Sequence, residues 1–463
     1  MVLINRDYRL LWVGQLVSQT GDFAFSTTLS LWIGTVVLAG RPYAPAAVSA
    51  LVVVMAVGTL LVGPAAGVFV DRWDHRRTML GADLVRAVLI GSLTVVAFLP
   101  GGTLSDTTVL VAVYVTVLLS TAAAQFFNPA RFALISEVVE PEQRARAAGI
   151  GQATQAIAVI AGPPLAAPLL FSVGVRWALL LNAVSFLVSL AAVRAVRPTR
   201  KRPVTGPEVG PGPATAVPPG QAPAAQVSSV RAEFLDGLRM VTRSRPVTAL
   251  VVTIVLVTIG ADALNSLNVF FVTDNLGAAS RWYGTLEMAL GFGLVAGALG
   301  TAWLAGRLSG ARVFSTCLIL TGIGLVAYSR LTGLGPAIVV LAVTGIPLAA
   351  VNASLTPVLL DHVPQSHLGR VIAVINPVQQ LAALVGVSAA GWLASTVLRG
   401  FSADIAGVRF GRIDTILTFS GLLVIAGGVY ATAALRSAHR PARQTRRPGD
   451  RAGSVSGAPG AGR

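Results

Sequence analysis

A few ionisable side chains stand inside long apolar stretches of this sequence. Asp22 lies twelve residues into the first stretch, about 18 Å along a helix and close to the middle of a membrane if the stretch spans one. Ionisable groups at that depth are expensive and usually functional. A carboxyl group there can bind and release a proton, so we expect Asp22 to couple protons or substrate. A structural acid that only hydrogen-bonds across helices is the alternative.

Three further acids lie in or near such stretches. Asp262 is sixteen residues into its stretch, about 24 Å along, and is our second candidate for proton coupling, although it can also reach an outer vestibule. Glu287 is one helical turn into the next stretch, where it can bind a cationic substrate or keep its carboxylate in water at the interface. Asp83 precedes Arg86 by three residues, a spacing that favours a structural ion pair on one helix face.

The elements that must hold these groups are strongly apolar. Hydrophobic residues make up 54% of the 463 residues and charged residues only 12%, where a soluble domain has about 25% charged residues. A soluble core cannot absorb so many apolar side chains, so the chain is predicted to be an integral membrane protein. The single cysteine, Cys317, excludes an internal disulfide.

Twelve apolar runs are long enough to cross a hydrocarbon core about 30 Å thick. They cover residues 10–38, 45–70, 78–100, 107–127, 148–172, 175–194, 246–272, 283–306, 311–330, 334–360, 370–397 and 411–435. Arginines gather at both termini and in the loops after even-numbered runs, and basic residues accumulate on the cytoplasmic side. We therefore expect a multi-pass protein of the bacterial inner membrane with both termini in the cytoplasm. The net charge of +16 then marks topology, and we expect no nucleic-acid partner.

This pattern predicts an all-α integral membrane protein with 12 transmembrane helices in two pseudo-symmetric six-helix bundles, at residues 1–196 and 233–435. Residues 197–232 are rich in Pro, Gly, Ala and Val, so we expect a flexible cytoplasmic linker. Residues 436–463 are basic and rich in Gly, Pro and Ser, which predicts a disordered tail. Membrane lipid is the expected neighbour of both bundles.

The two predicted bundles contain an internal repeat. Five residues of the first half recur 224 positions later with the same chemistry. They are Asn128, Glu137, Arg146, Gln155 and Gly162, matched by Asn352, Asp361, Arg370, Gln379 and Gly386. At a slightly different offset, Asp22 matches Asp262. Parallel halves around a central site are a transporter design, in which one half rocks against the other to alternate access.

The segment from residue 63 to residue 77 reads GPAAGVFVDRWDHRR and follows the second run. It resembles the signature loop of the major facilitator superfamily, and the resemblance implies that fold over all twelve spans. In the family this loop holds the halves together in the outward-facing state. We expect Gly67 to allow close approach of a neighbouring helix and Asp71 to cap the N-terminus of a facing helix. The gating-loop residues are Gly63, Gly67, Asp71, Arg72, Arg76 and Arg77.

Two other segments carry further resemblances, one of them to an exporter branch of that superfamily that includes enterobactin and macrolide efflux proteins. The N-terminal stretch from Asn5 to Trp12 is similar to that branch. Gly162 and Pro163 resemble the Gly-Pro antiporter motif, which in the family marks proton-coupled export, although Ala166 and Ala167 replace its trailing glycines. Many drug antiporters of the family carry an arginine in the fourth span, and the run 107–127 has none. Proton-relay details of those relatives are therefore not transferred.

Amide and aromatic side chains populate the helices that line the central cavity in this family, and such a lining suits a sizeable, partly apolar ligand. The candidates are Gln15, Gln19, Phe25, Gln125, Gln155, Asn265, Asn268, Glu287 and Gln379. Each can instead serve helix packing. Charged residues at the same ends of both halves suggest cytoplasmic gate pairs, Glu137 with Arg146 and Asp361 with Arg370.

These observations predict a proton-coupled antiporter that exports amphiphilic small molecules such as drugs, antibiotics or siderophores by alternating access. An importer or proton symporter of the same fold and a non-transporting membrane receptor are the alternatives. We find no P-loop and no catalytic cluster, so we expect no enzyme, no cofactor and no metal. The expected partners are a small-molecule substrate and protons, and the expected state is a monomer.

Overall fold

Twelve helices of 20 or more residues dominate the part of the chain that the computed structural model describes, residues 4–70, 72–100, 103–197, 238–239, 242–304, 309–363, 365–405 and 408–438. The first six are α1 (Arg6–Trp32), α2 (Ala44–Val70), α3 (His75–Phe98), α4 (Asp106–Val138), α5 (Arg144–Pro168) and α6 (Val175–Ala195). The other six are α8 (Arg245–Phe270), α9 (Tyr283–Leu304), α10 (Gly310–Ser329), α11 (Leu334–His362), α12 (Gln365–Trp392) and α13 (Arg412–Ala438). The predicted linker, 197–232, falls outside the described residues after its first residue, and so does most of the predicted tail, 436–463.

Short polar residues begin several of these helices. The Asn5 side chain accepts a hydrogen bond from the backbone N–H of Tyr8 at 2.7 Å, which caps α1. Asp74 accepts from the N–H of Arg77 at 2.7 Å and caps α3. Asp71, which we expected to cap a helix, lies outside the described residues.

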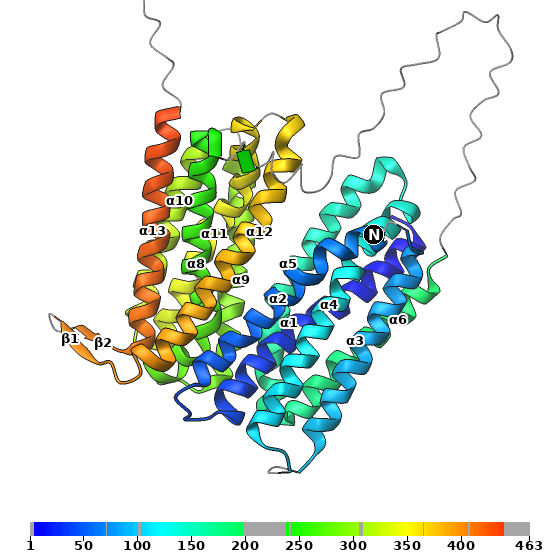
Figure 1. Ribbon diagram of the computed structural model, residues 1–463, viewed down its shortest axis with the longest axis horizontal. Helices are drawn as coiled ribbons and strands as arrows, with labels where there is room; N and C mark the ends of the chain where they lie inside the picture. Colours follow the sequence, from blue (N-terminus) through cyan, green and yellow to red (C-terminus); the bar gives the residue numbers. More distant parts are fainter. Residues whose placement is uncertain are drawn as a thin grey trace, which may run out of the picture.

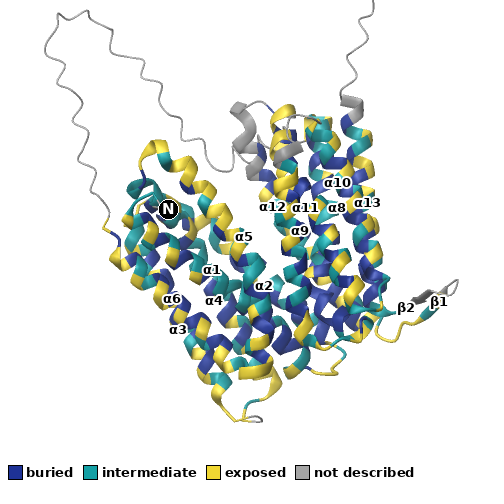
Figure 2. Cartoon of the chain, turned by 180° about the vertical axis from the view of Figure 1, so that it is seen from behind, coloured by how far each residue is buried: buried dark blue, intermediate teal, exposed yellow. Residues whose placement is uncertain are grey.

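Eleven helices of the described chain are long and apolar enough to cross a membrane, as judged by length and composition. The exception, α1, has the length but carries a polar face with Gln15, Gln19 and Asp22. It packs on α5 and α6, and these three polar side chains line an internal hollow of the N-terminal bundle. The outer faces of the bundles are exposed and apolar, as at Leu61 (73% exposed) and Leu299 (70% exposed), which suits a lipid environment (Figure 2).

The fourth span is longer than predicted. Pro129 lies inside α4, which continues to Val138 instead of ending near residue 127. A proline can be accommodated in a transmembrane helix because neighbouring groups satisfy the freed backbone atoms. Because α4 continues, Arg131 lies inside this helix.

The helices form two bundles, α1–α6 and α8–α13, which lean together at one end and diverge toward the end that carries the N-terminus (Figure 1). At the closed end, α2 contacts α12, and the backbone N–H of Ala46 donates to Ser395 Oγ at 3.0 Å. A second contact between the two bundles is made by α5 and α9. A Cβ at Gly284 would lie 2.5 Å from the carbonyl oxygen of Pro163, so this contact requires glycine.

The internal repeat predicted from the sequence is visible in the helix packing. Gly162 of α5 packs on α1, where a Cβ would lie 2.5 Å from the Cβ of Phe23. Its counterpart Gly386 of α12 packs on α8, where a Cβ would lie 2.7 Å from the carbonyl oxygen of Ile259. The related helices also end alike. Short π-helical turns follow α1, α5, α8 and α12, at Ile33–Val37, Leu169–Val173, Phe271–Asn275 and Leu393–Val397.

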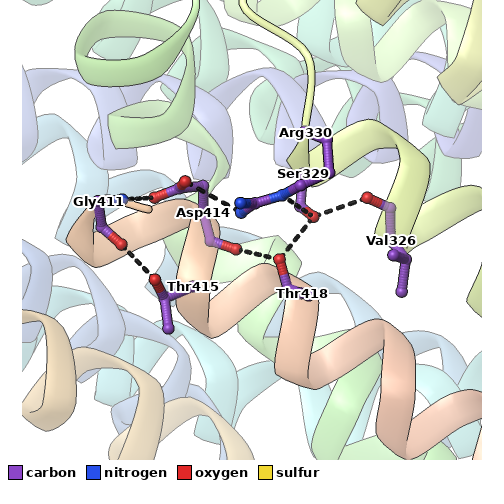
Figure 3. A network of polar contacts seen from close by, with 7 residues as sticks. All are labelled: Val326, Ser329, Arg330, Gly411, Asp414, Thr415 and Thr418. Atoms are coloured by element: carbon purple, nitrogen blue, oxygen red, sulfur yellow. Dashed lines mark hydrogen bonds and ion pairs between the residues drawn. The ribbon is translucent and has the colours of Figure 1, made fainter. Parts of the chain in front are cut away.

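A polar network joins α10 to α13 at the closed end of the C-terminal bundle (Figure 3). Asp414 accepts from the backbone N–H of Gly411 at 2.7 Å and pairs with Arg330 at 2.9 Å. The Ser329 and Thr418 hydroxyls hydrogen-bond to each other at 2.9 Å. Asp414 therefore caps α13 and fixes it to the end of α10. A short antiparallel hairpin, β1 (Ala403–Ile405) with β2 (Val408–Phe410), precedes α13 and adds a small element that the all-α prediction lacks.

Candidate functional site

The N-terminal bundle contains a hollow of about 530 Å³ beside α1 and α4, which continues into two smaller spaces that share lining residues. Parts of its wall come from α2 and α5, the helices that touch the other bundle, so the hollow faces that bundle. We call it the N-terminal hollow and define it by Gln15, Gln19, Asp22, Arg86, Arg131, Phe132 and Gln155. Its size is in the usual range for ligand pockets.

The predicted cavity residues of the first half meet in this space. Gln15, Gln19 and Gln155 line the hollow, and Phe25 and Gln125 line its deeper extension. Gln15 Oε1 accepts from Gln19 at 3.4 Å, and Gln125 donates to Thr59 at 3.3 Å. Two of these amides, Gln15 and Gln19, are therefore joined to each other at the wall of the hollow.

Asp22 is joined there by a charged partner. Arg86 Nη2 of α3 donates to Asp22 Oδ2 at 2.6 Å, and Arg86 Nη1 lies 3.8 Å from Asp83 Oδ1. The Asp22 side chain is 37% exposed and faces the hollow, whereas Asp83 is fully buried behind Arg86. The predicted Asp83–Arg86 pair is thus part of a cluster of three residues, the acid–arginine triad Asp22–Arg86–Asp83.

Aromatic rings hold the arginine of the triad in place. The guanidinium carbon lies 3.9 Å from the centre of the Phe186 ring and 5.8 Å from that of Phe127. Such cation–π contacts favour the charged arginine in an apolar setting. Two carboxylates beside one guanidinium carry one excess negative charge, which a single proton neutralises. The triad can therefore hold one proton at the wall of a space that can bind a ligand.

The C-terminal bundle holds a different polar network. Glu287 Oε1 of α9 accepts from Asn268 Nδ2 of α8 at 3.1 Å, and Asn268 Oδ1 accepts from the Tyr328 hydroxyl of α10 at 2.6 Å. Asn268 and Tyr328 are fully buried, and the Tyr328 ring packs on Phe271. In this conformation the amide of Asn268, predicted to line a cavity, joins α8 to α9 and α10, which corresponds to the packing alternative.

The remaining candidates of the second half are spread out. Asp262 accepts from Asn265 of its own helix at 3.0 Å. The side chains of Asn265 and Gln379 are exposed. Asp262 has no counterpart of Arg86 within ion-pair distance among the described residues.

The gating-loop residues contact the N-terminal bundle itself. Arg76 donates to the carbonyl oxygens of Val193, at 3.2 Å, and of Arg194, so it fixes the start of α3 to the end of α6. The Arg77 backbone binds the Asp74 cap, and Arg72 is exposed. The close approach expected at Gly67 is wrong for this conformation, since no atom lies within 4 Å of a Cβ built there. A Cβ built at Gly63 would lie 3.4 Å from Gln125 Oε1, which is an ordinary van der Waals contact.

The predicted gate pair of Glu137 with Arg146 is not formed in this conformation. Glu137 Oε1 lies 2.6 Å from His75 Nδ1, while Arg146 is exposed. Asp361 is exposed, and the side chain of Arg370 lies outside the described residues.

Two features escaped the sequence analysis. The Asp22–Arg86 contact joins residues 64 positions apart, which no spacing rule within one helix can find. Arg131 was missed because Pro129 predicts a helix end before it. The described residues contain no group of three or more His, Cys, Asp or Glu arranged to hold a metal ion.

Residues 11–387 match the family model of the Major Facilitator Superfamily. The chain belongs to this superfamily. Superfamily membership and the twelve-helix fold together make it a multi-pass membrane transporter, and they point away from an enzyme.

Similar proteins include an efflux protein. The chain is 27% identical to macrolide efflux protein A of Streptococcus pyogenes over 356 residues, which is 75% of this chain and 78% of the relative. A bacterial homologue of the iron transporter ferroportin shares the superfamily fold at 14% identity in its inward-facing state, with a TM-score of 0.69 over 94% of this chain and 99% of that one. The outward-facing structure of such a homologue gives a TM-score of 0.57 at 16% identity, over 93% and 100% of the two chains.

Proposed function

We propose that this transporter is a proton-coupled antiporter that exports amphiphilic small molecules from the bacterial cytoplasm by alternating access. The observation that carries the proposal is the acid–arginine triad at the wall of the N-terminal hollow. Its two carboxylates and one guanidinium can hold one proton beside a ligand. The similarity to an efflux protein favours export, and the amide and aromatic lining favours an amphiphile.

In the proposed cycle, the conformation described here is open to the cytoplasm, with both termini on that side as the arginine distribution predicts. Substrate enters the N-terminal hollow and reaches Asp22. The contacts between α2 and α12 and between α5 and α9 then open, and access moves to the outside. A proton from outside neutralises the excess charge of the triad, substrate leaves, and the protonated protein returns.

The proposal is tested in everted membrane vesicles that contain the full chain. Accumulation of fluorescent amphiphiles, including ethidium, doxorubicin and anthracenecarboxylic acid, is followed while a pH gradient is imposed and then collapsed. We expect gradient-dependent accumulation that is lost in Asp22→Asn, because the amide cannot exchange a proton.

Asp274→Asn is the matched control. Asp274 pairs with Arg412 at 2.7 Å and is 37% exposed, the same side-chain exposure as Asp22, but it lies in the other bundle. This variant should transport like the unmodified protein. Gradient-dependent accumulation that persists in Asp22→Asn would reject the triad as the coupling site. Absence of any gradient-dependent accumulation would reject export and leave the importer and receptor alternatives.

A further inference from the structure

Arg131 is a cation in the N-terminal hollow that the proposed proton cycle does not use. It lies in the part of α4 beyond Pro129 and lines both the main hollow and its extension toward α5. Two other arginines with largely buried side chains have acid partners. Arg86 pairs with Asp22, and Arg330 pairs with Asp414.

The contacts of Arg131 leave its charge without compensation. Nη1 donates to Gln15 Oε1 at 3.0 Å, and the guanidinium carbon lies 4.9 Å from the centre of the Phe132 ring. Nε is buried and has no hydrogen-bond partner. No carboxylate of the described residues lies within 4 Å of this guanidinium. A charge held away from water is costly unless it is paired, so this position is suited to a ligand that supplies the pair.

The charges of the hollow favour an acidic ligand over a cationic one. Among its lining residues, Asp22 is paired with Arg86 at 2.6 Å, and Asp83, the second carboxylate of the triad, is fully buried behind Arg86 and does not line the hollow. Arg131 is then the unneutralised charge on the wall. A guanidinium binds a carboxylate through two parallel hydrogen bonds, which fixes the orientation of the ligand as well as its charge.

An apolar surface lies next to this cation. Phe132 is 65% exposed although it is a large apolar side chain, and it lines the same hollow as Arg131. Trp12 contributes to the same wall, with its indole N–H donating to Thr154 at 2.7 Å. A flat apolar body can pack on these rings while an acidic group reaches Arg131.

We propose that Arg131 is the recognition site for a carboxylate group of the transported molecule, so that the substrates are acidic amphiphiles with an aromatic or other apolar body against Phe132. This inference rests on the proposed function only in assuming that the hollow binds the transported molecule. It requires no proton coupling.

The test measures binding to the full-length protein in lipid nanodiscs, with no gradient present. Three probes share one aromatic body: anthracenecarboxylic acid, its methyl ester, and aminomethylanthracene. Equilibrium dialysis against empty nanodiscs corrects for partition into lipid. We expect the acid to bind about ten-fold more tightly than the ester or the amine. Only the acid can form a charge-assisted hydrogen bond with Arg131, and the free energy of such a bond corresponds to about this factor in affinity.

Substitutions of Arg131 test whether the preference for the acid depends on this residue. Arg131→Gln should weaken binding of the acid about ten-fold and leave the ester within about two-fold, because only the acid loses its ion pair. Arg131→Lys should retain part of the preference for the acid, since lysine keeps the positive charge but cannot form the bidentate hydrogen bonds of a guanidinium. Arg176→Gln is the control, because Arg176 also stacks on a phenylalanine, Phe98 at 5.3 Å, but does not line the hollow.

Several results would overturn the proposal. The first is binding of the amine or the ester at least as tight as binding of the acid. The second is no binding of any of the three probes. The third is an equal loss of affinity for all three probes in Arg131→Gln. Gradient-driven export that survives such a result would reject the carboxylate site alone. Conversely, intact acid preference without gradient-driven export would reject the proposed function and keep the site.

Discussion

In the N-terminal bundle, Arg86 lies 2.6 Å from Asp22 and 3.8 Å from Asp83, and the cluster opens onto a ligand-sized hollow. In the C-terminal bundle, Glu287 accepts from Asn268 at 3.1 Å, and Tyr328 donates to the same amide at 2.6 Å. The first cluster combines opposite charges at an accessible wall. The second joins one acid to uncharged donors, of which Asn268 and Tyr328 are fully buried.

The helix packing of the two halves is much more alike than these clusters. Gly162 and Gly386 make the same close contact in each half, and π-helical turns end the corresponding helices. Asp262 matches Asp22 in the repeat but hydrogen-bonds to Asn265 instead of an arginine. The helix packing is therefore repeated in the two halves, whereas the polar clusters differ.

The largest effect is expected when the arginine of the triad is removed. Arg86→Met leaves Asp83 fully buried without its cation, and losing one member of a buried ion pair costs about 3–5 kcal/mol of folding free energy. Thermal unfolding of the purified protein measures the loss. The double variant with Asp83→Asn should recover much of it, because the uncompensated charge is gone.

Arg412→Met provides the surface control for that experiment. Its partner Asp274 is 37% exposed, so the free energy of unfolding should fall by less than about 1 kcal/mol. If Arg86→Met were as stable as this control, the triad would not be an ionic cluster in the folded protein, and the contrast between the bundles would disappear.

The C-terminal network should be weaker, and Asn268→Leu tests it. Leucine leaves the Tyr328 hydroxyl and Glu287 without their common partner, so we expect a loss of about 2 kcal/mol in unfolding free energy. Adding Tyr328→Phe should restore part of that loss, because one unsatisfied donor is removed. Asn352→Leu, at an exposed position of α11, should change stability by no more than about 0.5 kcal/mol. Additive losses in the double variant would contradict a shared network.

The repeated scaffold makes a third prediction, in which both halves should respond alike. Gly162→Ala and Gly386→Ala each place a Cβ within 2.7 Å of a neighbouring helix, so each should cost about 1–3 kcal/mol through overpacking. Gly149→Ala in α5 meets no atom within 4 Å and should be neutral or slightly stabilising. Thermal unfolding of the three variants decides this. A cost in only one half would mean that the repeat does not extend to packing.

The sequence predicts the scaffold better than the site, for physical reasons. Apolar runs bounded by charge, Gly or Pro locate α2 at Ala44–Val70 and α6 at Val175–Ala195 to within one residue of the predicted spans 45–70 and 175–194. The Asp83–Arg86 pair follows from spacing on one helix. Contacts between helices, such as that of Arg86 with Asp22, depend on packing that no local pattern encodes.

Two expectations drawn from local sequence rules differ from the structure in this conformation. Pro129 predicts a helix end, yet α4 continues and brings Arg131 to the hollow. Gly67 predicts close packing, yet it faces open space in this conformation, since the bundles separate at that end. The close contact predicted at Gly67 can therefore belong to another conformation of the protein.

The smallest change in stability is expected from Glu287→Gln. This variant also tests whether protons are exchanged in the N-terminal or in the C-terminal bundle. The glutamine oxygen can still accept from Asn268, so the free energy of unfolding should change by less than about 1 kcal/mol. If protons are exchanged at the triad, this variant should keep gradient-driven accumulation within about two-fold of the unmodified protein, while Asp22→Asn abolishes it. The comparison uses the same vesicles and probes for both variants. Loss of coupling in Glu287→Gln, with stability and binding intact, would instead assign proton exchange to the C-terminal bundle. In that case the triad would be a positioning device for substrate, and the accessible charge of Asp22 would serve recognition alone.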